Sequence, residues 1–405
     1  MARVQGGLGS TSSMVRLNSV EYKPISARDI LVELKDTSEL MVDLAYSAAL
    51  FHSQALAEVV MELESHVDDL IYFLEMDLML AARNAEDAEA LVGLSKVGTS
   101  VDTISNAAAD IALLVLKDVG IHPIVRDAFR RVEERVVRAV VKPGSSIVGK
   151  RVGELDPWVE VIAVRRDGRW IIYPEDGEVV EAGDVLIARG APEEVGELVE
   201  LAERRPEVAP TVEIPSKHFQ AIADKLVELK DTSEFMVDLA YSSLLLNSRE
   251  LAEEVMRLED YVDDLHQEFE LLVLSSGFSP ADAKNFLGLI RLGVVTEEIA
   301  DAAAEIAEVV LRGLKPHPVI RLVIRESEER VTRVQVSKNS KLVGVRLREA
   351  RIPEETGMWI LAIRRGKRLI RPKPDTRIKA GDILIACGYA EGEAELKALA
   401  SPTGG

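Results

Sequence analysis

The sequence predicts an α+β multidomain chain in which a helical unit and a small strand-rich α/β unit alternate, each occurring twice. The segment LVELKDTSEL that begins at Leu31 returns almost unchanged at Leu226, an offset of 195 residues. Within each copy, apolar residues first recur at helical spacing and then gather in short runs separated by turn residues. Because the offset persists into the strand-rich part, both copies are expected to fold alike.

The first part of each copy is predicted to form three helices. Leu56, Val60, Leu63 and Val67 step by four and three, which places them on one face of an amphipathic helix. The long periodic stretch 27–82 is expected to divide near Ser53. Asn84 with Asp87 predicts a capped helix that begins near residue 85, and Ser279-Pro280-Ala281-Asp282 predicts its counterpart near 280.

The second part of each copy is predicted to contain a hairpin. In the first copy, residues 159–164 and 170–173 flank Asp167-Gly168, the dipeptide that two-residue hairpins prefer. In the second copy, residues 359–363 and 369–370 flank Gly366-Lys367, which suits a turn with glycine first. Different turn residues are therefore expected to produce the same hairpin.

The remaining elements set the domain boundaries. A short buried strand is expected after a Gly-Asp turn in each copy, at 185–188 and 383–386, and a helix at 193–203. The expected organisation is a flexible tail (1–24), a helical repeat (25–120), an α/β domain (121–203), a linker (204–217), a second helical repeat (218–315) and a second α/β domain (316–401).

Charge and cysteine content exclude several classes of protein. The 49 basic and 69 acidic residues give a net charge of −20, which argues against binding to nucleic acid. The single cysteine, Cys387, permits no internal disulfide and indicates a reducing compartment. We find no signal peptide and no segment for membrane insertion, so a cytoplasmic protein is expected. Scarce glutamine beside abundant Glu and Arg suggests a thermophile.

The strand-rich units resemble the RCK C-terminal (TrkA-C) domain. The similarity lies in IAVRRDG (162–168) and VEAGDVLI (180–187). The equivalent segments of the second copy are ILAIRRG (360–366) and IKAGDILI (378–385). The resemblance implies small ligand-sensing modules that pair and that regulate potassium channels and transporters.

The helical units are similar to PhoU, whose three-helix repeat has an E-x-x-x-D signature. ESHVD (64–68), EDYVD (259–263) and EEIAD (297–301) fit this signature, whereas DTISN (102–106) departs from it because an amide cannot replace a carboxylate as a metal ligand. The combination resembles archaeal PhoU/TrkA-C proteins linked to potassium transport.

Acidic residues at helical spacing form candidate metal sites. Carboxylates four or eleven residues apart share a helix face, and two such faces across a bundle offer an all-oxygen site for Mg, Ca, Mn or Fe. The candidates are Glu64, Asp68, Asp102, Asp110, Glu259, Asp263, Glu297, Asp301 and Glu305, with Glu75 and Glu270 extending two of the stripes. The alternative interpretation is a solvated acidic face.

Paired arginines on the hairpins are candidate ligand-binding residues. Arg165-Arg166 and Arg364-Arg365 are neighbours on a strand, so only one of each pair can point into a shared pocket. That arginine could hold a phosphate or carboxylate of a small ligand such as a nucleotide. The other arginine of each pair should then face solvent. The alternative interpretation is an edge-strand charge that prevents aggregation.

The favoured function is a non-enzymatic regulator of potassium transport. The α/β domains are expected to bind a small ligand, and the helices to contact a membrane channel or transporter, peripheral to the inner face of the membrane. The two helical repeats are expected to form one body, and the α/β domains to pair as an intramolecular pseudo-dimer or in a homodimer. The alternatives are a metal-binding PhoU-type regulator of phosphate uptake and a carboxylate-metal hydrolase. His122-Pro123 and His317-Pro318 are interpreted as structural joints.

Overall fold

The chain folds into a body of long helices that carries two small sheet domains. The computed structural model describes residues 26–119, 135–155, 159–190, 192–203, 217–277, 282–313, 329–366 and 368–402. The predicted tail, most of the predicted linker, and both His-Pro steps lie outside the described residues.

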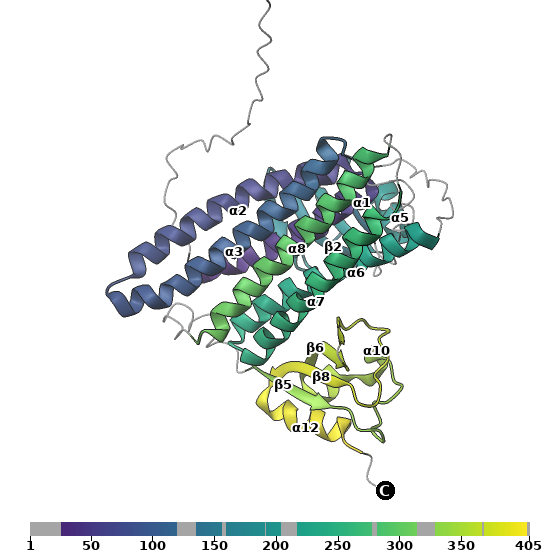
Figure 1. Cartoon of the computed structure of the whole chain (residues 1–405). Helices are drawn as coiled ribbons and strands as arrows, with labels where there is room; N and C mark the ends of the chain where they lie inside the picture. Colours follow the sequence, from purple (N-terminus) through teal and green to yellow (C-terminus); the bar gives the residue numbers. More distant parts are fainter. Residues whose placement is uncertain are drawn as a thin grey trace, which may run out of the picture.

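Each repeat contributes three helices to the helical body. They are α1 (Ala27–Phe51), α2 (Gln54–Ala81) and α3 (Ala85–Leu116), followed by α6 (Lys217–Leu245), α7 (Arg249–Leu274) and α8 (Ala283–Leu311). One hydrophobic core contains residues from both repeats, and α3 runs beside α8 (Figure 1). The prediction that the two repeats form one body is confirmed.

Local capping explains where the helices start. The break near Ser53 is confirmed, since His52 adopts a left-handed φ of 52° and the Ser53 side chain accepts a hydrogen bond from the Leu56 amide. Asn84 caps α3 as predicted, with its side chain accepting from the Asp87 amide at 2.9 Å. Most of the predicted Ser-Pro cap in the second copy lies outside the described residues, and α8 begins just after Asp282.

Helix α3 is long and apolar enough to cross a membrane by length and composition. Its most apolar window is 61% buried against the rest of the protein. Core helices of soluble bundles have the same properties, and α3 belongs to the shared core of the helical body.

The two sheet domains have the same strand order. The first contains β1 (Arg135–Val140), β2 (Val159–Arg166), β3 (Arg169–Ile172) and β4 (Val185–Gly190) in the order β1-β4-β2-β3. The second contains β5 (Glu329–Gln335), β6 (Met358–Arg365), β7 (Arg368–Ile370) and β8 (Ile383–Tyr389) in the order β5-β8-β6-β7. All of these pairs are antiparallel. The predicted strands are therefore present, while β1 and β5 were not predicted.

Both predicted hairpins form at the expected residues. Asp167 and Gly168 have φ angles of 50° and 78°, and they join Arg166 to Arg169 across a two-residue turn. Gly366 has a φ of 64° and follows Arg365, which pairs with Arg368. Positive φ values at these positions explain why glycine and aspartate are present.

Each sheet packs one face on the helical body and the other on its own helices. In the first domain Ile162, Ala163 and Ile187 join the core of the helical body, while the opposite face covers α5 (Pro192–Glu203). A 3₁₀ turn, η1 (Val152–Glu154), completes this domain.

The second sheet domain repeats this arrangement. Ala362 and Ile385 join the helical core, and the opposite face packs on α12 (Ala390–Ala400), with α10 (Leu347–Ala350) and α11 (Ile352–Thr356) alongside. In the described parts of the chain the outer faces of the two sheets have separate cores, while their inner faces both join the core of the helical body. The expected intramolecular pseudo-dimer therefore has no common core made by the two sheets alone. Pairing between chains stays a prediction.

A glycine on the third helix of each repeat allows close contact with the second helix. A Cβ atom added at Gly293 would lie 2.8 Å from Cε1 of Phe269, whereas one added at Gly98 would lie 3.2 Å from Cδ2 of Leu74. These pairs occupy equivalent positions at the 195-residue offset. The buried aromatic ring in the second repeat leaves less room than the flexible leucine in the first.

We expect Gly293→Ala to lower the free energy of unfolding by about 1 kcal/mol. Overpacking a core costs about 1–3 kcal/mol, and this is partly offset by about 1 kcal/mol from the better helix propensity of alanine. Gly98→Ala should be neutral or stabilising, and Phe269→Leu should rescue Gly293→Ala. Urea unfolding followed by circular dichroism measures all three, and equal effects at the two glycines would contradict this packing argument.

Candidate functional site

Three carboxylates of the second repeat form the most compact acidic group among the described residues. Glu259 and Asp263 lie one turn apart on α7, and Asp301 faces them from α8. One carboxylate oxygen from each lies within 4.8 Å of the others. Burial, followed by the neighbouring carboxylates, raises the pKa of Glu259 and of Asp301. An all-oxygen group of this kind fits a hard cation such as Mg²⁺, Ca²⁺ or Mn²⁺.

Other candidate metal ligands of the second repeat have different partners. Glu297 lies 3.3 Å from Nδ1 of His266, and Glu270 lies 3.7 Å from Nε2 of the same ring. Glu305 accepts a hydrogen bond of 3.0 Å from the hydroxyl of Ser100 on α3. His266 was not predicted from the sequence. It lies one turn from Asp263 and one turn from Glu270 on α7, and this helical spacing would have indicated it.

The candidate ligands of the first repeat gather less tightly. Burial raises the pKa of Glu64, with further contributions from Asp68, Asp102 and Asp110, so these four groups are close enough to interact. In the described ranges they do not form a group as compact as that of the second repeat. The physical reason is Asn106, which replaces the carboxylate found at Asp301 and hydrogen-bonds Asp102. Glu75 accepts a hydrogen bond from Ser95 instead.

One arginine of each candidate pair stabilises its own sheet domain. Arg166 forms a two-pronged contact with Asp184, at 2.9 and 2.8 Å, and also contacts Glu178. Arg365 binds Asp382 in the same way, with both distances at 2.8 Å. Both aspartates are 1% exposed. These arginines therefore hold the Gly-Asp turn that precedes β4 or β8.

The other arginine of each pair contacts the helical body. Arg165 lies 2.9 Å from Glu62 on α2, with its guanidinium 5.8 Å from the ring centre of Trp170. Arg364 lies 2.8 Å from Glu254 on α7, which is 3% exposed. The alternative interpretation of edge-strand charges is wrong, because β2 and β6 are inner strands. All four arginines have protein partners, so neither member of a pair is left to solvent.

A cleft of about 1180 Å³ lies between the β2–β3 hairpin and helices α1 and α2. Arg165, Arg169 and Trp170 line it from the hairpin. Four acidic side chains and His66 line it from the helices, the acidic ones being Asp29, Glu33, Asp36 and Glu62. Among the predicted ligand-binding residues, Arg165 lines this cleft. Trp170 beside it was not predicted from the sequence.

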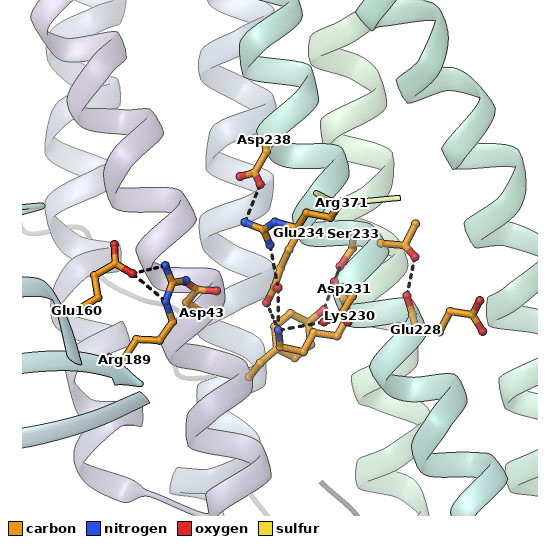
Figure 2. A network of polar contacts seen from close by, with 12 residues as sticks. Asp43, Glu160, Arg189, Glu228, Lys230, Asp231, Ser233, Glu234, Asp238 and Arg371 are labelled. Atoms are coloured by element: carbon orange, nitrogen blue, oxygen red, sulfur yellow. Dashed lines mark hydrogen bonds and ion pairs between the residues drawn. The ribbon is translucent and has the colours of Figure 1, made fainter. Parts of the chain in front are cut away.

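A second group that the sequence analysis missed lies where α1 and α6 meet. Lys230 and Glu234 on α6 form an ion pair of 2.6 Å, and Arg371 of the second sheet domain reaches Asp238 at 2.8 Å (Figure 2). Arg189 of the first sheet domain approaches Asp43 on α1 at 3.3 Å. The repeated ELKDTSE at 33–39 and 228–234 was the signal, because the same run of charged residues precedes the same apolar run in both copies.

The sequence models of two known domains agree with this architecture. The sequence model of the PhoU domain matches residues 31–115 and 226–310, and that of the TrkA-C domain matches residues 136–202 and 331–401. The crystal structure of PhoU from Pseudomonas aeruginosa is 14% identical, with a TM-score of 0.42, and covers 74% of this chain and 96% of that chain. The GsuK RCK domain is 14% identical, with a TM-score of 0.18, and covers 78% of this chain and 79% of that chain.

Two curated proteins are similar over shorter segments. Uncharacterized transporter sll0640 from Synechocystis is 38% identical over 69 residues, which are 17% of this chain and 11% of that protein. Potassium channel protein 1 from Methanocaldococcus jannaschii is 37% identical over 79 residues, which are 19% of this chain and 24% of that protein. The alignments therefore span less than a quarter of either relative. Since both domain types are matched in both copies, the chain belongs to the PhoU and TrkA-C families as a tandem PhoU/TrkA-C protein.

Proposed function

We propose that this protein is a cytoplasmic, non-enzymatic regulator of potassium transport, whose TrkA-C domains bind a small ligand and whose PhoU-like helices contact a membrane transporter. PhoU and TrkA-C are regulatory domain families, and the two curated relatives are named as a transporter and a potassium channel. The observation that carries the proposal is the pairing of Arg364 with Glu254 and of Arg371 with Asp238. These contacts connect a sheet domain directly to α7 and α6, so a ligand that shifts the sheet also shifts the helices.

The cleft beside Arg165 is our proposed ligand site. Trp170 offers an aromatic face for a flat ring, and Arg169 offers a cation for one phosphate or carboxylate. The four carboxylates on the helical side disfavour a second phosphate. A ligand of low net charge, such as a nucleoside or mononucleotide, fits this lining best.

Thermal-shift titration with adenosine, AMP, ATP, NAD and cyclic di-AMP tests the ligand site. A ligand that binds the folded protein raises its melting temperature. Trp170→Leu introduces the residue that the second copy has at the equivalent position, Leu369, and should abolish the shift. No stabilisation by any of these compounds, or unchanged stabilisation of the variant, would count against this site.

Rubidium uptake tests the regulatory role. Cells that express a Trk-type potassium transporter are compared with and without this protein, and we expect a change in the initial rate of uptake. Arg364→Met should reduce that change, because it disconnects β6 from α7. Identical uptake curves would contradict the proposed function.

The second candidate function is a metal-binding, PhoU-type regulator of phosphate uptake, and the group Glu259, Asp263 and Asp301 favours it. We expect Mn²⁺ to raise the melting temperature, and Asp301→Asn to abolish this effect because it introduces the amide found at Asn106. Asp264→Asn removes the same charge from an exposed neighbouring position and serves as the control. Elemental analysis that finds no bound metal after dialysis against Mn²⁺ would remove this candidate.

A further inference from the structure

Two identical charged segments meet inside the helical body. Lys35 lies 2.7 Å from Glu39 on α1, and Lys230 lies 2.6 Å from Glu234 on α6. The side chains of Glu39 and Glu234 are 14% and 8% exposed. The two glutamates are therefore mostly removed from water, and each has a lysine of its own helix beside it.

Tyrosines join each segment to the other repeat. The hydroxyl of Tyr241 on α6 lies 2.9 Å from that of Ser38 on α1. The hydroxyl of Tyr46 on α1 lies 3.4 Å from that of Ser233 on α6 and donates a hydrogen bond to Thr296 on α8. These hydrogen bonds join α1 to α6 and α8 next to the two glutamates, and the charge of each glutamate acts on the nearby tyrosine of the other repeat.

Both sheet domains reach this network. Arg371, just after β7, contacts Asp238 at 2.8 Å and lies 3.8 Å from Glu234. Arg189 on β4 contacts Asp43 at 3.3 Å (Figure 2). Asp43 and Asp238 are equivalent at the 195-residue offset, and the charge of Asp43 acts on both Glu234 and Asp238. The arginines of two separate domains thus meet one group of carboxylates.

Ten charged residues in and around helices α1 and α6 form what we call the α1/α6 charge network, and acidic groups outnumber basic groups in it. Its six carboxyl groups and four cations are Asp36, Glu39, Asp43, Asp231, Glu234 and Asp238, with Lys35, Lys230, Arg189 and Arg371. Arg189 also pairs at 2.7 Å with Glu160 of its own sheet domain, which is 56% exposed and is not counted in the network. Two protons would balance the charges of the six carboxyl groups and four cations. Glu39 and Glu234 are the least exposed of the six, and Oε1 of Glu39 has no hydrogen-bond partner in the described residues.

We propose that the α1/α6 charge network is a proton-binding site that takes up two protons per chain, on Glu39 and Glu234, and that releasing them strengthens its hold on Arg371 and Arg189. With both protons bound, four carboxylates face four cations. With both released, the uncompensated negative charge attracts the two arginines more strongly. The proton state of the helical body therefore sets how firmly both sheet domains are held.

The surroundings of each glutamate support this assignment. Burial raises the pKa of Glu39 to about 7, with Asp36 and Asp238 adding to the shift and Lys35 opposing it. Tyr241 and Tyr173 also face this carboxyl group, and their own pKa values are raised by burial and by its charge.

Glu234 has equivalent surroundings. Burial raises its pKa to about 7, with Asp43 and Asp231 adding to the shift and Lys230 opposing it. Tyr46 and Arg371 also lie close enough to interact with Glu234. The folded-state pKa lies above the value of 4.5 for a free glutamate, so these groups favour folding at low pH and this contribution is lost as pH rises from about 4.5 to about 7.

Carbon-13 NMR of glutamate carboxyl groups tests the proton site directly. Protein labelled at the glutamate side-chain carboxyl is titrated from pH 4 to 9, and the single variants Glu39→Gln and Glu234→Gln identify the two signals. We expect both signals to have midpoints near 7. Glu33→Gln, on the same helix as Glu39, is the control and should leave both signals in place. Midpoints near 4.5 would overturn the proposal.

Hydrogen exchange tests the coupling to the sheet domains. After correction for the chemical rate, exchange in β4 and in residues 368–373 should be slower at pD 8 than at pD 6. The double variant Glu39→Gln, Glu234→Gln mimics the protonated state and should lose this difference while remaining folded. An equal pD response in the wild type and the double variant would overturn the coupling.

Discussion

Replacing Lys230 by methionine is expected to destabilise the helical body by about 3 kcal/mol at pH 8, which is the cost of leaving a buried charge without its partner. Lys230 is the closest cation to Glu234, which is 8% exposed and whose other cation, Arg371, lies 3.8 Å away. At pH 5.5 Glu234 can take up a proton, because burial raises its pKa to about 7. The cost should therefore be much smaller there.

Urea unfolding of Lys230→Met and wild type at the two pH values measures this effect. The matched control is Lys225→Met, on the same helix, since Lys225 contacts Glu268, which is 62% exposed. An exposed pair of this kind contributes about 0–1 kcal/mol. A cost for Lys230→Met that is the same at pH 5.5 and pH 8 would show that Glu234 does not take up a proton.

The variant Arg166→Met is expected to destabilise the first TrkA-C domain by about 3–5 kcal/mol. It leaves Asp184, which is 1% exposed, without the guanidinium that binds both of its oxygens. Asp184 also accepts a hydrogen bond from the amide of Glu181, so the turn before β4 should loosen as well. Limited proteolysis and thermal unfolding report the loss of this domain.

The neighbouring variant Arg165→Met is the control. Its partner Glu62 is 44% exposed, so the expected cost is about 1 kcal/mol or less. Arg365→Met should repeat the large effect in the second domain, because Asp382 has the same geometry. Equal costs at Arg165 and Arg166 would contradict the division between a contact within the domain and a contact with the helices.

Local features of the fold could be predicted from the sequence, because they depend on residues close in the chain. Ser53 and Asn84 cap helices through atoms three residues away, and Asp167-Gly168 makes its turn with its own backbone angles. Strands β1 and β5 were missed because each is defined by pairing with β4 or β8, about 50 residues further on. The alternation of helical and α/β units could be predicted because the sequence repeats at an offset of 195 residues.

The sequence predicts which functional residues share a helix face or a strand, but not which residues of other elements they contact. The four-residue spacing of Glu259 and Asp263 places them on one face of α7, but the helix crossing decides that Asp301 joins them and that His266 faces Glu297. Similarly, an irregularity in the pairing of β2 with β4 between Val161 and Ala163 precedes the arginine pair. A shift of one residue exchanges the two faces of a strand, which a pattern of alternation alone cannot predict.

The shared core of α3 and α8 gives this protein a property that a symmetric dimer of single repeats would lack. In such a dimer every substitution appears on both sides of the axis, whereas here each half can differ while the other keeps its residue. Two differences of this kind are Asn106, which is equivalent to Asp301 in the second copy, and Trp170, which is equivalent to Leu369. Covalent fusion thus fixes a one-to-one ratio of unlike halves, so each half can change its residues while the other keeps its own.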